Sequence, residues 1–99
     1  MHLSINHLAT FLVVVQHGSM TTAARALTLS LSTVSAHVAH LERQLHTPLL
    51  RRGAQGCEPT AAGRQLVDRA GTLLDLHADI LHASRTWSDR APAGEGALR

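Results

Sequence analysis

Small hydroxyl and imidazole side chains gather between Ser30 and Leu45, in the stretch SLSTVSAHVAHLERQL. Val34, Val38, Leu41 and Leu45 recur at helical spacing within it and predict one buried face of a helix. The other positions lack the Glu, Lys and Arg that usually cover a solvated helix face. They are instead small or able to hydrogen-bond: Ser32, Thr33, Ser35, Ala36, His37, Ala39 and His40. Such a surface is suited to lying close against a partner.

The charged composition narrows the kind of partner. All nine basic residues are arginine, and the formal net charge is +2. Arginine donates paired hydrogen bonds to phosphate or carboxylate, although a GC-rich coding sequence would produce the same bias without functional meaning. Eight histidines add positive charge below neutral pH. The single Cys57 excludes an internal disulfide and favours a reducing cytoplasm.

Metal, redox and catalytic chemistry have less support. His37 and His40 lie one helical turn apart, but zinc sites need three or four ligands, and CxxC and HExxH spacings are absent. Cys57 is interpreted as a small apolar filler in a hairpin. We find no Ser, His and acid arrangement and no suitable carboxylate pair, so we expect neither an enzyme nor a cofactor. No apolar run approaches the ~20 residues of a membrane span, and no signal sequence begins the chain.

Three helices are predicted to position the polar stretch. Ser4 caps the first, which ends at Gly18 and faces inward with Ile5, Leu8, Leu12 and Val15, beside Phe11. Ser19 caps a short second helix, whose inward residues are Met20, Ala23, Ala24 and Leu27. Ser30 caps the third helix after a tight turn. Two helices joined in this way form a helix-turn-helix, which can place its second helix in the DNA major groove but is also common as a purely structural unit.

A hairpin is expected to follow, in the stretch TPLLRRGAQGCEPT. Pro48 ends the helix, a turn spans 53–56, and the chain returns through Cys57 to Thr60. Arg51 and Arg52 lie near its base. A hairpin in this place is a wing that contacts the sugar-phosphate backbone, or else an ordinary surface loop with two solvated arginines.

A long fourth helix is predicted from Thr60, a good N-cap, to Trp87. At that length it measures roughly 42 Å and exceeds what a small body can cover, so a second copy of the helix is its simplest partner. The proposed dimer seam comprises Leu66, Ala70, Leu73, Leu74, His77, Ile80, Leu81, Ser84 and Trp87. His77 and Ser84 weaken it. The next residues, SDRAPAGEGALR, have the composition of a linker.

The order of these residues resembles a known family. The chain is similar, from Ile5 to Gly63 without a gap, to the winged helix-turn-helix of LysR-type transcriptional regulators. The matching positions are Phe11, Val15, Gly18, Ser19, Ala23, Ala24, Leu27, Ser30, Val34, Ser35, Leu41, Glu42, Leu45, Pro48, Leu49, Arg52, Thr60, Ala62 and Gly63.

The resemblance implies a mainly α fold: three helices and a two-stranded β-hairpin wing over 3–62, then a dimerisation helix over 63–88. It also implies a bacterial, cytoplasmic regulator that binds double-stranded DNA as a homodimer, or as a tetramer when intact. Residues 89–99 would then be a flexible hinge toward an effector-binding domain that this chain lacks, and a small-molecule effector would act only through that domain. The alternative is a dimerising winged-helix module for protein interaction, with weak or lost DNA specificity.

Departures from the family pattern concern DNA contact. Leu31, Ser32 and Ala36 replace residues that would offer hydrogen-bond donors, while His40 and Gln55 stand where basic residues are frequent. The candidate DNA contacts are Ser19, Met20, Thr21, Thr22, Ser30, Leu31, Ser32, Thr33, Ser35, Ala36, His37, His40, Arg51, Arg52 and Gln55. With His37 and His40 near phosphates, DNA binding is expected to tighten as the pH falls from about 8 to 6.

Overall fold

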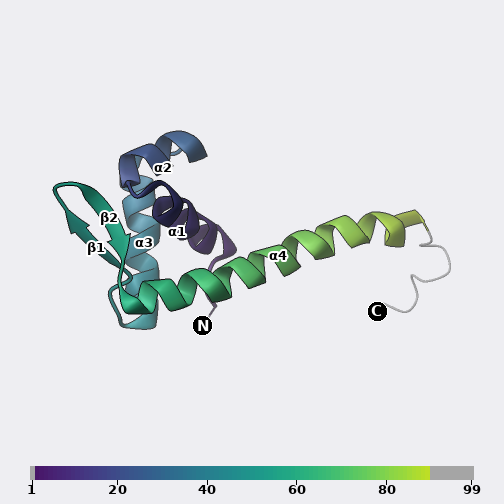
Figure 1. Ribbon diagram of the computed structural model, residues 1–99. Coiled ribbons are helices and arrows are strands. Elements are labelled where there is room, and N and C mark those ends of the chain that lie inside the picture. Colours follow the sequence, from purple (N-terminus) through teal and green to yellow (C-terminus); the bar gives the residue numbers. More distant parts are fainter. Residues whose placement is uncertain (1, 90–99) are drawn as a thin grey trace.

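The computed structural model describes residues 2–89, so the predicted linker lies outside the described residues from 90 onward. The described part contains four helices and one antiparallel hairpin, which confirms the predicted fold (Figure 1). The elements in chain order are α1 (Ile5–His17), α2 (Met20–Leu27), α3 (Leu31–Leu45), β1 (Leu50–Gly53), β2 (Gly56–Pro59) and α4 (Ala61–Asp89).

Hydroxyl side chains start all four helices, as predicted. Ser4, Ser19, Ser30 and Thr60 each accept a hydrogen bond from a backbone N–H three residues on, at 3.0–3.3 Å. Caps of this kind typically contribute about 1 kcal/mol each to stability. Gly18 ends α1 in the left-handed conformation, with φ 68°.

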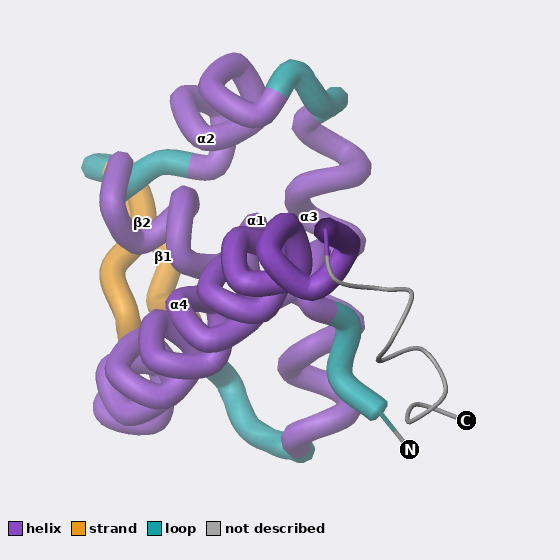
Figure 2. The backbone as a smooth tube through the Cα atoms, turned by 90° about the vertical axis from the view of Figure 1, so that its right-hand side faces the viewer, coloured by secondary structure: helices purple, strands orange, loops and turns teal. Residues whose placement is uncertain are grey.

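One hydrophobic core forms where α1 packs against α2, α3 and α4 (Figure 2). Its largest fully buried side chains are Leu8, Phe11, Val14, Val34, Val38, Leu41 and Leu49. The predicted stripe of α3 is confirmed at Val34, Val38 and Leu41, whereas Leu45 is half-buried against the core. On α1, however, Phe11 and Val14 are buried while Leu12 and Val15 are only half-buried. Three helices contact α1, so its buried face is wider than the single stripe that the sequence spacing indicates.

The long helix α4 starts on this core and then leaves it (Figure 1). Ala70 is only 2% exposed, and Leu66 and Val67 pack beside it against the core. Assigning Ala70 to a dimer seam is therefore corrected, because it is already covered within its own chain, whereas Leu66 is half-buried. None of the helices within 2–89 is apolar over enough of its length to cross a membrane.

Candidate nucleic-acid interface

The turn between α2 and α3 is held by backbone hydrogen bonds. Thr28 adopts the left-handed conformation, with φ 57°, and its N–H donates to the carbonyl of Arg25 at 3.2 Å. The next N–H, of Leu29, donates to the carbonyl of Ala24 at 2.9 Å. Buried Ala23 and Ala24 let α2 lie close to α3, since their small side chains keep the two backbones near each other. The start of α3 is thus fixed relative to α2.

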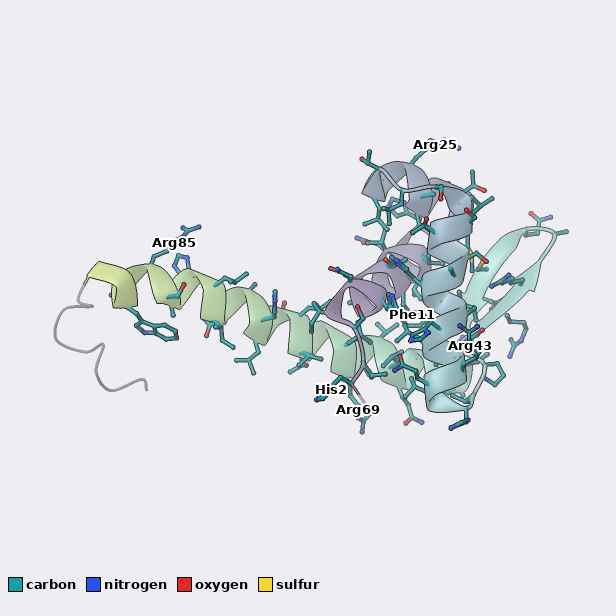
Figure 3. The ribbon with its side chains drawn as sticks, turned by 180° about the vertical axis from the view of Figure 1, so that it is seen from behind. His2, Phe11, Arg25, Arg43, Arg69 and Arg85 are labelled. Atoms are coloured by element: carbon teal, nitrogen blue, oxygen red, sulfur yellow. The ribbon has the colours of Figure 1, made fainter. Side chains whose placement is uncertain are left out.

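One side of α3 is left uncovered, with the hairpin alongside it (Figure 3). We call this side the reading face; at 100° per residue its members span about 140° of the helix. They are Leu31, Ser32 and Ala36, which are exposed, and Ser35 and Ala39, which are half-buried. The hydroxyls of Ser30 and Thr33 bond to each other at 2.8 Å as part of the cap. The reading face therefore offers methyl groups and the hydroxyls of two serines.

His37 and His40 belong to another side of α3, so their placement on the reading face is corrected. The Thr10 hydroxyl lies 2.8 Å from Nδ1 of His37 and itself donates to the carbonyl of Asn6 at 2.9 Å. A hydroxyl has one proton, so Nδ1 of His37 must be the donor in this pair. His7 on α1 completes a histidine cluster, with ring centroids 4.4 Å from His37 and 5.1 Å from His40.

The surroundings of His7 in the histidine cluster disfavour its protonated, positively charged form. Burial, and then the neighbouring His37 and His40, lower the pKa of His7 from its ordinary 6.5. Nδ1 of His7 is buried and has no hydrogen-bond partner among the described residues. Protonation would place a proton on that atom without an acceptor. Arg43, whose Nη2 lies 3.5 Å from Nδ1 of His40, adds a permanent positive charge nearby.

Acidification is therefore expected to destabilise the packing of α1 on α3. Because the folded pKa of His7 is below 6.5, the unfolded chain takes up its proton first, and stability declines as the pH falls from about 6.5 to the folded value. Thermal unfolding at pH 7.5 and 5.5 measures the effect. The His7→Gln variant should lose less stability between these values than the parent; an equal or larger loss would contradict the prediction. That DNA binding tightens at low pH through the half-buried His37 and His40 stays a prediction.

The hairpin, which we call the wing, presents its two arginines on opposite faces. Arg51 pairs across the sheet with Glu58, and Arg52 pairs with Cys57. Both arginines are exposed, as is Gln55 at the tip. Arg52 thus has no acidic residue directly opposite it, whereas a carboxylate partly offsets the charge of Arg51.

Contacts at both ends fix the wing on the helices. A carboxylate oxygen of Glu42 on α3 accepts from the N–H groups of Leu49 at 2.7 Å and Leu50 at 3.3 Å. Toward the tip, the N–H of Cys57 donates to the carbonyl of Gly18 at 3.0 Å. Gly56 has φ 124°, and a Cβ there would collide with the same carbonyl. Only the family match drew attention to Glu42, and no spacing in the sequence predicted its role.

The start of α2 also borders this surface. Thr21 is exposed and Thr22 half-buried, beside the cap Ser19. Met20 is a correction, because its side chain is only 9% exposed and belongs to the core. Its buried side chain is not accessible to a partner.

Beyond the core, α4 carries large exposed apolar side chains. Of the predicted seam, Leu73, Ile80, Leu81 and Trp87 are 43–60% exposed, His77 is exposed, and Leu74 and Ser84 are half-buried. Leu76, which the seam omitted, is 55% exposed. Within 2–89, no three His, Cys, Asp or Glu residues are arranged to hold a metal ion.

Comparison with known proteins identifies similar sequences and folds. The model of the family "Bacterial regulatory helix-turn-helix protein, lysR family" matches residues 5–64. The putative HTH-type transcriptional regulator protein PtxE of Stutzerimonas stutzeri is 42% identical over 86 residues, which cover 87% of this chain and 44% of PtxE. The chain spans less than half the length of the curated relatives it matches.

Two crystal structures of protein–DNA complexes have a similar fold. The CbnR DBD–DNA complex matches with a TM-score of 0.82 and 30% identity, covering 86% of this chain and 98% of that one. The BenM DBD/catB site 1 DNA complex matches with a TM-score of 0.83 and 27% identity, covering 86% and 94%.

Proposed function

The chain belongs to the LysR family of bacterial helix-turn-helix regulators, and on this premise we propose that it binds double-stranded DNA in transcription regulation. The reading face of α3 enters the major groove, and the wing contacts the sugar-phosphate backbone beside it. The observation that carries the proposal is the uncovered reading face of α3 with the wing beside it, a wing that hydrogen bonds to Glu42 and Gly18 hold in place and that carries two exposed arginines (Figure 3). The DNA complexes of CbnR and BenM support duplex DNA as the partner.

Two parts of the chain have different roles in this function. Residues 3–62 bind DNA, while the helix over 63–88 joins two copies through its exposed apolar side chains beyond Ala70. A homodimer would present two reading faces to two half-sites of one duplex. As a regulator of bacterial genes the protein would act in the cytoplasm, and we propose no enzymatic reaction for it.

One observation favours a second function. The first three turns of α3 contain no Arg, Lys, Asn or Gln, the side chains that most often make specific contacts with bases. A dimerising module for protein interaction, with weak DNA specificity, would have such a surface. A salt titration separates the two functions, since only DNA binding depends steeply on salt concentration.

Removing the Arg52 charge should weaken binding to all duplex sequences by similar factors. If a dimer neutralises about six phosphates, the log–log slope of affinity against salt is roughly −5, and Arg52→Ala in both subunits should reduce its magnitude by about 2. Arg51→Ala should have a smaller effect, because Glu58 lies opposite Arg51. Fluorescence anisotropy with mixed-sequence DNA at several salt concentrations measures each slope.

Arg85→Ala is the matched control for Arg52→Ala. It removes the same charge from α4, far from the wing (Figure 3). If Arg85→Ala lowers the slope as much as Arg52→Ala, the effect reflects net charge alone. A change in preference at one base, with mixed-sequence binding intact, would also contradict a backbone role for Arg52.

A further inference from the structure

We propose that Leu31 is a specificity-determining residue that recognises the C5-methyl group of thymine in the major groove. This inference rests on the proposed function and names the base that the reading face selects. It starts from the exposure of Leu31, which is 49% although leucine is usually buried in a small domain. Leu31 opens α3, and the N-terminal residues of such a helix are those that meet base edges.

The backbone around Leu31 is held in place, so the point from which its side chain projects is defined. The preceding Ser30 caps α3 with its hydroxyl, which accepts from the Thr33 N–H at 3.1 Å. The turn before it is fixed by the Thr28 and Leu29 hydrogen bonds to α2. An exposed apolar side chain on an ordered backbone suits contact with one particular group on a partner, because only the side-chain rotamers remain to be ordered on binding.

Most of the other hydrogen-bonding side chains of α3 are directed elsewhere. His37 bonds to Thr10 and lies against His7 on α1. Gln44 donates to the carbonyl of His2 at 3.1 Å. Arg43 shares the arc of the reading face but lies in the last turn of α3, beside His40 and about 18 Å along the helix from Leu31. Paired hydrogen bonds to guanine require Arg or Lys, and those to adenine require Asn or Gln. The reading face has none of these residues.

The groups that remain match one base best. The reading face offers the serine hydroxyls and the methyl groups of Leu31, Ala36 and Ala39. Thymine is the only base that presents a methyl group in the major groove. Serine hydroxyls donate or accept with any base and distinguish little by themselves. Leu31 is the longest apolar side chain on the face and the one best able to cover that methyl group.

The test removes single methyl groups from DNA. Sites are first selected from a random duplex pool with the whole chain, and each thymine of the selected site is then replaced by uracil, which lacks only the C5-methyl. At one thymine per half-site, affinity should fall about fourfold, or about 0.8 kcal/mol at 1.4 kcal/mol per factor of ten. Leu31→Ala should bind the thymine and uracil sites equally. Leu31→Gln should change the selected base at that position to adenine.

Leu29→Ala is the matched control, since Leu29 is 38% exposed but lies in the turn outside the reading face. It should keep the fourfold preference for thymine. Equal affinity of the parent for the thymine and uracil sites would overturn this inference alone. So would an affinity difference that is lost in Leu29→Ala and kept in Leu31→Ala. Failure of the parent to bind any duplex would instead overturn the proposed function.

Discussion

Leu73→Asp and Ile80→Asp are each expected to convert the protein into a folded monomer. Both side chains are more than 40% exposed on the part of α4 that extends beyond the core, so an aspartate there leaves the winged domain intact. In a dimer the same aspartate would be buried opposite its own copy, and an unpaired charge in an apolar interface is strongly unfavourable. Sedimentation velocity should show the change in mass, and circular dichroism should show unchanged helix content.

The same variants should bind a two-half-site duplex far more weakly. A linked second site typically raises affinity by about 10²–10⁴-fold, and a monomer loses this advantage while its contacts with a single half-site remain. His82→Asp is the matched control, because the exposed His82 lies on the opposite side of the helix from Ile80. It should stay dimeric. If Leu73→Asp and Ile80→Asp also remain dimers, the copies associate through another surface.

Gly63→Ala should destabilise the protein by about 3 kcal/mol, whereas Gly71→Ala in the same helix should stabilise it by up to about 1 kcal/mol. A Cβ at Gly63 would collide with the backbone carbonyl of Leu49, and Gly63 is buried where α4 meets the wing. A Cβ at Gly71 would meet nothing within 4 Å. There the substitution only removes the excess backbone freedom of glycine from a helix interior.

Urea unfolding followed by circular dichroism measures both substitutions. The midpoint should move to lower urea for Gly63→Ala and to higher urea for Gly71→Ala, with similar slopes. Equal midpoints for Gly63→Ala and the parent would mean that α4 does not approach the Leu49 carbonyl closely. The pair controls for the general effect of a glycine-to-alanine change in a helix.

The sequence predicted the features that depend on neighbours in the chain. Ser4, Ser19, Ser30 and Thr60 begin helices because their hydroxyls reach an N–H only three residues away. Apolar spacing likewise located the buried face of α3, and glycines located the turn of the wing. Such signals are local, so one sequence is enough to interpret them.

Features that depend on distant partners were not predicted. His37 and His40 lie at the border of the buried stripe of α3, so the sequence could not show whether they are covered or exposed. The group that holds His37 against α1 is Thr10, which lies 27 residues away in the sequence. Ala70 was assigned to a dimer for a similar reason. The apolar spacing of α4 continues from the core into the exposed helix without a break, and spacing alone cannot show where the body ends.

The surfaces proposed to contact DNA were predictable in position but not in detail. Leu31, Ser32 and Ala36 are exposed, as are the wing arginines, whereas His37 and His40 lie against His7 on α1. Glu58 lies opposite Arg51 because of the pairing register of the two strands. The turn residues in the sequence did not determine that register. The anchoring of the wing by Glu42 needed the path of the chain after Pro48.

The uninterrupted α4 leaves the core after Ala70 as one rigid arm. From Ala70 to Trp87 the helix rises about 26 Å, so each degree of tilt where it leaves the core moves the far end by about 0.4 Å. A displacement of one base-pair step, about 3.4 Å, then corresponds to a tilt of about eight degrees. In a dimer held together at the far ends, the angle at which α4 leaves the core sets the distance between the two reading faces. A small change in the packing of Leu66 and Ala70 on the core would therefore appear on DNA as a different spacing of half-sites.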